Sequence, residues 1–281
     1  MPEPNSKVMS MNSIRQPAVA GLFYPDDAGV LQNAVDEYIS LTPANDNDSR
    51  LDSISPKAVI VPHAGYPYSG ATAGRAFHKL LPVADRIRRV VLLGPSHRVG
   101  FHGVAFCSSD AFRTPLGDVP VDHSALVAIS DLPGVSILDR AHAQEHSLEV
   151  QLPFLQSVLT DFKLVPLVVG DADQQTVASV IERLWGDDHT LFVISTDLSH
   201  FYDDNTARQL DAQTCHSIEA LSPESIGDEQ ACGRNPMKGL LEVARRKHMR
   251  VETLGLCNSG DTTGDRERVV GYGAWALWEP A

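Results

Sequence analysis

Three apolar runs in this chain each lead into a histidine or an acid. They are Val-Ile-Val-Pro-His-Ala-Gly-Tyr at residues 59–66, Val-Val-Leu-Leu-Gly-Pro-Ser-His at 90–97 and Phe-Val-Ile-Ser-Thr-Asp-Leu-Ser-His at 192–200. A short, continuously apolar run is typical of a strand that is buried on both faces, as the strands of a parallel sheet are. We therefore predict a largely parallel β-sheet at the core of the protein.

Helix-like and strand-like segments alternate along the rest of the chain. Helical spacing of apolar residues predicts helices at 28–41, 69–81, 123–130, 145–159, 173–185, 205–221 and 235–247. Further strands are predicted at 103–108, 163–169, 190–195, 251–256 and 269–278, and a turn-rich connection at 114–121. This alternation predicts an α/β fold, a single-domain three-layer α/β/α sandwich around a mostly parallel or mixed central sheet.

Individual residues refine two of the predicted helices. Pro153 lies inside the segment 145–159, where it predicts a kink or a break. Asn235 is a good N-cap residue and Pro236 suits the first helical position, so we expect a helix to open there.

The polar segments set the expected domain limits. Residues 1–14 lack hydrophobic periodicity and are expected to form a mobile tail. The segment 44–55 is polar and is expected to be a disordered connector. The remaining chain, 15–281, has no other linker and is predicted to be one domain.

Composition and charge narrow the classes of function. The chain of 281 residues has 23 basic and 36 acidic residues, a net charge of −13, which disfavours nonspecific binding to nucleic acid or to anionic membranes. No apolar run approaches the roughly 20 residues of a membrane span, and no signal-peptide core is evident, so we expect a cytoplasmic protein. The four cysteines form no CxxC pair and are expected to be thiols.

The polar residues that follow the apolar runs are the first candidates for a site. Because ligands of open α/β sheets bind beyond the carboxyl ends of the strands, His63, His97, Asp197 and His200 are expected to converge. Imidazoles with a carboxylate suit a transition-metal centre or an acid/base pair. Asp197 and His200 are three residues apart, so on a helical turn they would share a face and the carboxylate would orient the histidine. Alternatively, Asp197 caps the turn after its strand.

Two further segments carry chemistry that suits such a site. Cys232 precedes a predicted helix start and lies close to Arg234, and both features favour a thiolate, a good ligand for copper, zinc or iron. The alternative is a small residue packed in a loop. Glu145 and His146 open another predicted helix, where an acid is favoured by the helix dipole and the histidine can face the pocket.

The chain resembles the Memo-like proteins, also called AmmeMemoRadiSam system protein B, from Arg15 to Trp278. The resemblance is carried by these segments in order: Gln-Pro-Ala-Val-Ala-Gly-Leu-Phe-Tyr-Pro (16–25), Pro-His-Ala-Gly-Tyr (62–66), Gly-Pro-Ser-His (94–97), Glu-His-Ser-Leu-Glu-Val-Gln-Leu-Pro-Phe (145–154), Ser-Thr-Asp-Leu-Ser-His (195–200), Cys-Gly (232–233) and Asn-Ser-Gly-Asp (258–261). That family is similar in structure to the LigB-type, class III extradiol dioxygenases, which use non-haem iron.

The resemblance implies roles for individual residues. It makes His63, His97 and Cys232 the ligands of one metal ion, iron or copper, with zinc as a further candidate. It gives His200 the place of the catalytic acid/base histidine of the dioxygenases, with Asp197 beside it. Cys232 stands where those enzymes have a glutamate ligand, so dioxygenase activity does not follow from the resemblance. The remaining expected pocket residues are His146, Glu145, Tyr66 and Phe23.

Three functions are compatible with these residues. The first is metal-dependent redox chemistry on an unknown substrate. The second is a non-enzymatic binding module that takes a phosphotyrosine or acidic peptide into the same pocket, as the association of animal family members with phosphotyrosine peptides implies. The third is metal-assisted hydrolysis by a bound water of lowered pKa. The expected ligand is a small molecule or peptide, and the family name implies a functional link to a radical SAM protein.

Overall fold

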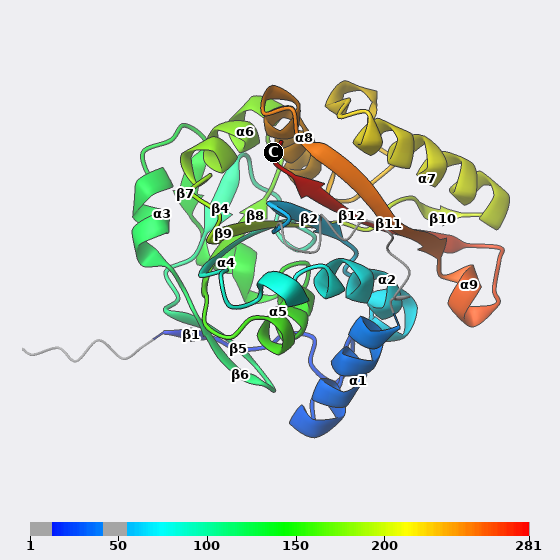
Figure 1. Cartoon of the computed structure of the whole chain (residues 1–281), viewed down its shortest axis with the longest axis horizontal. Coiled ribbons are helices and arrows are strands. Elements are labelled where there is room, and N and C mark those ends of the chain that lie inside the picture. Colours follow the sequence, from blue (N-terminus) through cyan, green and yellow to red (C-terminus); the bar gives the residue numbers. More distant parts are fainter. Residues whose placement is uncertain (1–12, 42–54, 281) are drawn as a thin grey trace, which may run out of the picture.

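A computed structural model describes residues 13–41 and 55–280. They form an α/β/α sandwich with helices on both faces of a central sheet (Figure 1), so the predicted fold class is confirmed. The predicted tail lies outside the described residues except for Ser13 and Ile14, and Ile14 belongs to strand β1. The predicted connector also lies outside them, except for Ser55. In the described part of the chain, no helix is long and apolar enough to cross a bilayer.

The central sheet is mixed, with a parallel centre. Over the described residues its strand order is β10-β12-β2-β9-β3-β8-β4-β7, and β11 also pairs with β12. The strands are β2 (Ala58–Val61), β3 (Arg89–Pro95), β4 (Val104–Phe106), β7 (Val135–Ile137), β8 (Lys163–Val169), β9 (Thr190–Ser195), β10 (His200–Tyr202), β11 (Arg250–Asn258) and β12 (Val269–Trp278). Strands β2, β9, β3 and β8 are mutually parallel, whereas β12 and β4 join them antiparallel.

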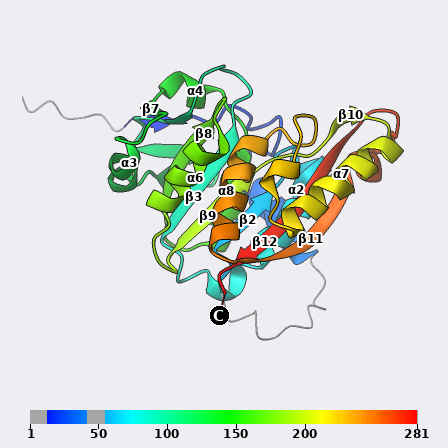
Figure 2. The same ribbon diagram turned by 90° about the horizontal axis from the view of Figure 1, so that it is seen from above.

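Helices cover the two faces of this sheet. Helices α1, α2 and α5 lie on one face, and α6, α7 and α8 lie on the other (Figures 1 and 2). The α-helices are α1 (Ala28–Ser40), α2 (Tyr66–His78), α3 (His123–Ile129), α4 (Asp139–Ala143), α5 (Leu152–Val158), α6 (Gln174–Arg183), α7 (Asp204–Glu219), α8 (Arg234–Arg246) and α9 (Gly260–Thr263). The 3-10 helices are η1 (Leu81–Val83), η2 (Glu149–Gln151) and η3 (Pro223–Ser225).

The strands form where the apolar runs predict them, because they are buried on both faces. Every residue of β2 and of β9 is buried. Burying a valine, leucine or isoleucine side chain contributes about 1.5–3 kcal/mol, which favours these runs as the centre of the sheet. The predicted strand 190–195 coincides with β9, and the predicted strand 163–169 coincides with β8.

A small second sheet lies where the sequence predicts only a connection. It has the order β1-β5-β6, with β1 (Ile14–Arg15), β5 (Ala111–Thr114) and β6 (Gly117–Pro120). The turn-rich segment 114–121 is therefore partly strand, because β6 pairs antiparallel with β5. Gly117 has a φ of 122°, which glycine adopts readily and which permits the tight turn between them.

Two predicted helix starts are wrong. The segment 145–159 is not one helix, because residues 145–148 form a loop and α5 begins only at Leu152, with Pro153 in its first turn. Helix α8 begins at Arg234 and its N-cap is Gly233 rather than Asn235. Instead, the side-chain amide of Asn235 donates to the carbonyl oxygen of Gly170.

Candidate metal centre

Neighbouring strands bring the predicted site residues to one edge of the sheet. Because β2, β9 and β3 lie side by side and run parallel, their carboxyl ends lie at the same edge. His63 follows β2, His97 follows β3 and Asp197 follows β9. A cavity of about 440 Å³ opens there. It is lined by Leu22, Phe23, His63, Ala64, Gly65, Tyr68, His97, His146, Asp197, His200, Ser259, Val270 and Tyr272.

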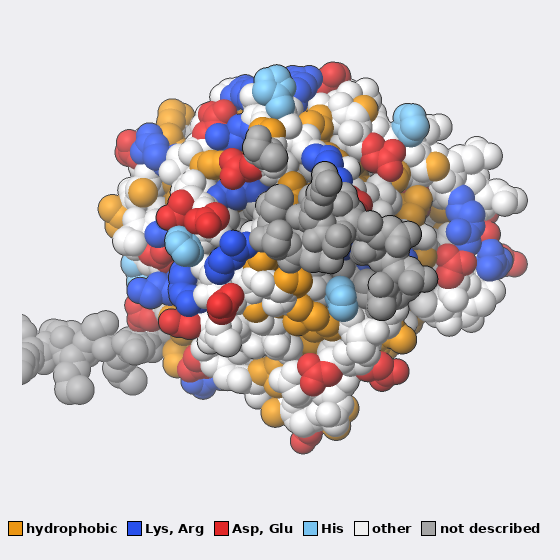
Figure 3. All heavy atoms as spheres, viewed as in Figure 1, with side chains coloured by type: hydrophobic (Ala, Val, Ile, Leu, Met, Phe, Trp, Pro, Cys, Tyr) orange, Lys and Arg blue, Asp and Glu red, His pale blue; other side chains and the backbone are white. Residues whose placement is uncertain are grey.

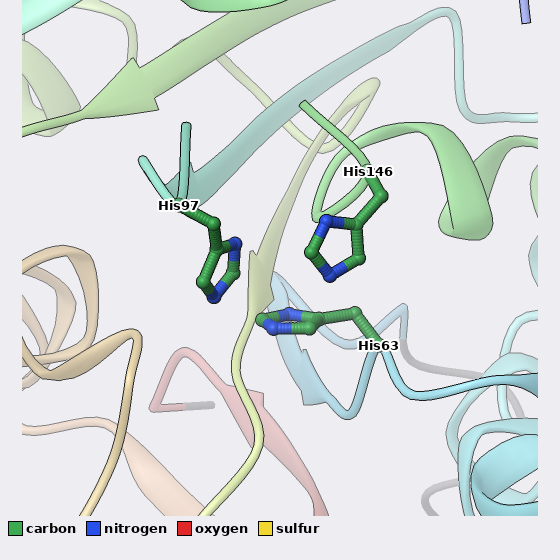
Figure 4. Close-up of side chains that lie close together, drawn as sticks. All are labelled: His63, His97 and His146. Carbon is green, nitrogen blue, oxygen red and sulfur yellow. The ribbon is translucent and has the colours of Figure 1, made fainter. Parts of the chain in front are cut away.

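Three imidazole side chains, from His63, His97 and His146, point toward one another (Figure 4). One ring nitrogen of each lies within 4.8 Å of those of the other two. The ring centroids are 5.1 Å apart for His63 and His97, 5.4 Å for His63 and His146, and 4.6 Å for His97 and His146. The sequence places His146 in the pocket, but it does not show that this histidine joins the other two as a third donor.

The side chain of Ser195 fixes the proton on His63. Its hydroxyl donates to the carbonyl oxygen of Ser147 at 2.5 Å, so the same oxygen accepts from Nδ1 of His63 at 2.9 Å. The side-chain amide of Gln151 donates to that oxygen as well, at 2.9 Å. Nδ1 of His63 therefore carries the hydrogen, and the lone pair on Nε2 is left for another partner.

Glu145 has the corresponding role for His97. Its Oε1 accepts from Nδ1 of His97 at 2.9 Å, and its Oε2 accepts from the backbone N–H of the same residue at 2.6 Å. The backbone N–H groups of His146 and Ser147 also donate to this carboxylate. A carboxylate behind an imidazole is the usual support of a metal-binding histidine, because it leaves Nε2 unprotonated.

Burial keeps two imidazoles of this cluster, those of His63 and His146, neutral. It lowers the pKa of His63 well below the ordinary value, and the positive charge that His97 would carry lowers it further. The same two causes lower the pKa of His146 to about 4. Burial alone would raise the pKa of Glu145, but the hydrogen bonds and charge of His97 outweigh it, and the pKa falls to about 2. At neutral pH these two histidines are neutral donors and Glu145 is ionised.

Cys232 lies next to Nε2 of His63. Its Sγ is 3.3 Å from Nε2 of His63 and accepts from the backbone N–H of Asp197, also at 3.3 Å. The sulfur is not within 4.8 Å of all three clustered ring nitrogens. Burial, followed by the charge of Asp197, raises the pKa of this thiol to about 12. Cys232 is therefore a protonated thiol at neutral pH unless a cation displaces the proton.

Asp197 and His200 both line the cavity, but Asp197 does not orient His200. Residues 196–199 are not helical. Oδ1 of Asp197 accepts from the backbone N–H of His63 at 2.7 Å, whereas Nδ1 of His200 is bonded to the carbonyl oxygen of Leu198 at 2.8 Å. Burial raises the pKa of Asp197 to about 7 and lowers the pKa of His200. His200 thus offers an unprotonated Nε2, and Asp197 is poised to gain or lose a proton near neutrality.

The other two expected pocket residues differ in position. The ring of Phe23 lines the cavity and packs edge-on against His146, with centroids 4.8 Å apart. Tyr66 is buried and is not among the residues that line the cavity. Its hydroxyl donates to the carbonyl oxygen of Val150, and its ring packs on Phe154.

A buried ion pair that has no signature in the sequence supports the loop of Glu145 and His146. Arg15 pairs with Glu149, and the two side chains are 5% and 0% exposed. The same guanidinium donates to the carbonyl oxygens of His142 and Glu145. Glu149 also accepts from Tyr24. These contacts tie the N-terminal segment to the loop, and a charged pair so distant in sequence has no local signature.

Comparisons with known proteins agree with the resemblance seen in the sequence. A model of the Memo-like protein family matches residues 15–276. A MEMO1 family protein of Aquifex aeolicus is 36% identical over 274 residues, covering 92% of this chain and 97% of the relative. One from Archaeoglobus fulgidus is 36% identical over 271 residues, with the same coverage. A solved structure of an uncharacterized Escherichia coli protein has a TM-score of 0.47 at 12% identity, covering 76% of this chain and 98% of that one.

Proposed function

Since the chain belongs to the Memo-like protein family, we propose that its histidine cluster holds one transition-metal ion, iron or copper, for redox chemistry on a small molecule. His63 and His97 would bind through Nε2, flanked by His146 and by Cys232 as a thiolate. The observation that carries this proposal is the set of hydrogen bonds that holds a proton on Nδ1 of His63 and of His97. The Nε2 atoms of His63 and His97 therefore each have a free lone pair for a metal, beside the imidazole of His146.

The donor set fits a metal of this class. Neutral imidazoles suit iron, copper and zinc, and a thiolate favours the softer metals. When bound, the metal would supply electron transfer and Lewis acidity. The chain itself would supply the proton chemistry: Nε2 of His200 can accept a proton from a substrate in the cavity, and the carboxyl group of Asp197 can hold a proton near neutral pH.

Of the alternative functions, peptide binding has less support. A phosphopeptide or acidic peptide needs fixed positive charge, but no lysine or arginine is among the described residues that line the cavity. Arg98 lies outside that lining, and its positive charge contributes to the lowered pKa of His146. Hydrolysis would use the same histidines, and imidazoles with one thiolate suit zinc as well as copper, so the metal that binds decides between hydrolysis and redox chemistry.

Metal titration of the stripped protein tests the proposal. Full-length protein freed of metal by chelation is titrated without oxygen with iron(II), copper(I) and zinc(II) against a competing chelator. We expect stoichiometric binding of iron or copper, lost in His63→Ala and retained in His216→Ala, a matched variant whose side chain is 90% exposed. Equal binding by both variants would contradict the site assignment. Tight zinc binding without iron or copper binding would contradict the redox function and support hydrolysis.

A further inference from the structure

A second cavity lies on the other side of Cys232. Its volume is about 530 Å³, and it opens between the carboxyl ends of β3 and β8 and the start of α8. It shares no lining residue with the histidine cavity. It is lined by Pro95, Ser96, Val99, Gly100, Phe101, His102, Val169, Gly170, Asp171, Cys232, Arg234, Asn235 and Pro236.

The thiol of Cys232 connects the two cavities. Its sulfur contacts Nε2 of His63, which lines the first cavity, and the same residue lines the second. Ser96, in the second cavity, directly precedes His97, in the first. A molecule in the second cavity would therefore reach the sulfur side of the histidine cluster without passing through the first cavity.

Arg234 supplies a cation to this second cavity with most of its hydrogen-bonding capacity unused. Its Nε pairs with Asp228 at 3.0 Å, but the carboxylate of Asp228 is 81% exposed. Such surface pairs contribute little, because solvent screens them. The guanidinium makes no hydrogen bond to another side chain of the described residues, so its terminal nitrogens can bind a planar carboxylate in a bidentate manner.

The other charges of the cavity oppose an anion only weakly. Asp171 also lines it, but this carboxylate is 79% exposed and pairs with His102 at 3.1 Å. Because it faces solvent and has a basic partner, its repulsion is screened. The rest of the lining includes apolar walls from Val99, Phe101 and Val169. One guanidinium and apolar walls suit a monocarboxylate better than a phosphate dianion.

We propose that the second cavity binds a small organic carboxylate, with its charged end on Arg234 and its body against the thiol of Cys232. The first cavity would then receive one reactant of the metal centre and the second cavity another. That the second cavity holds a reactant of the metal centre rests on the proposed function. That it binds a carboxylate is independent of the proposed function, because this binding needs no metal.

Alkylation of Cys232 in the metal-free, full-length protein tests this proposal. The sulfur displaces iodide either from iodoacetate, a carboxylate, or from iodoacetamide, its neutral counterpart, and peptide mass spectrometry follows the modification at Cys232. The ratio of the two rates is independent of the thiol pKa. We expect the iodoacetate-to-iodoacetamide ratio at Cys232 to exceed that of N-acetylcysteine amide, a thiol without a carboxylate, in the same buffer. In Arg234→Gln the ratio falls about two- to fivefold, the range of one exposed ion pair.

One further variant sharpens the test. Arg234→Lys keeps the charge and should keep most of the ratio. An unchanged ratio in Arg234→Gln would overturn the proposal. This result does not depend on metal binding, so failure here and failure of the metal assignment are separable.

Discussion

Two hydrogen-bond acceptors determine which ring nitrogens of the histidine cluster are free. The hydroxyl of Ser195 accepts from Nδ1 of His63, and Glu145 accepts from Nδ1 of His97. An imidazole that could exchange tautomers would lose part of its affinity for a metal, because the proton would compete for Nε2. The chemistry of the site therefore depends on residues that do not bind the metal themselves.

The substitution Glu145→Gln tests this dependence. A glutamine retains one acceptor oxygen, but its amide group would oppose the N–H donors of His97, His146 and Ser147. We expect metal affinity to fall about 10- to 100-fold, the usual effect of losing such a support. Competition with a chromophoric chelator measures it. Glu229→Gln, at an exposed position, is the control. Equal affinities in a folded Glu145→Gln protein would show that Glu145 does not act on the metal.

The pH dependence of zinc binding tests whether Cys232 binds as a thiolate. The pKa of the Cys232 thiol is raised to about 12, so at any pH well below 12 a metal must displace the proton of the thiol in order to bind the sulfur. Affinity should then rise about tenfold per pH unit between about pH 7.5 and 9. This range lies above the pKa of about 7 for Asp197 and above the lowered pKa values of His63 and His146. Those groups therefore add no slope.

Cys232→Ala is the matched variant for that measurement. It should bind zinc more weakly and with an affinity nearly independent of pH over the same range, because the thiol whose proton the metal must displace is gone. If the wild-type protein shows the same flat profile, the thiol does not bind the metal and the three histidines alone form the donor set. Isothermal calorimetry in two buffers of different ionisation enthalpy counts the released proton directly.

At the level of elements, the apolar runs predict the strands well and the loops poorly. Strands β8, β9 and β12 coincide with their predicted ranges, and β2 and β3 begin within one residue of the apolar runs at 59–66 and 90–97, because these segments are almost entirely buried. The helix predicted from residue 145 begins only at Leu152, with Pro153 in its first turn, because a proline cannot donate the hydrogen bond that a position inside a helix requires. The role of Ser195 as the acceptor for Nδ1 of His63 cannot be predicted from the sequence either, because a serine at the end of a buried strand has no distinctive pattern.

The link between the N-terminal segment and the loop before α5 is expected to be important for stability. Glu149→Ala would leave the guanidinium of Arg15 buried without its partner, at a cost of about 3–5 kcal/mol in the free energy of unfolding. Urea denaturation measures this cost. The control is Glu224→Ala, which removes an exposed partner of Arg245 and should cost about 0–1 kcal/mol. Similar small losses in both variants would contradict the importance of the buried pair.

At the scale of the whole molecule, the order of strands places the site. The chain order is β2, β3, β9, but the sheet order is β2-β9-β3, which brings the segments after all three strands to one edge. The sequence predicts that edge and places His146 in the pocket, but it predicts neither the contact of His146 with His63 and His97 nor the second cavity. On the face seen in Figure 3, acidic and basic side chains are interspersed, although the net charge is −13.

Elemental mass spectrometry of the native protein tests the central claim most directly. The full-length protein is purified without oxygen, chelator or a metal-based affinity step, and its metal content is compared with that of His63→Ala. We expect close to one iron or copper ion per chain in the native protein and little in the variant. Fully folded native protein that contains neither metal would contradict it.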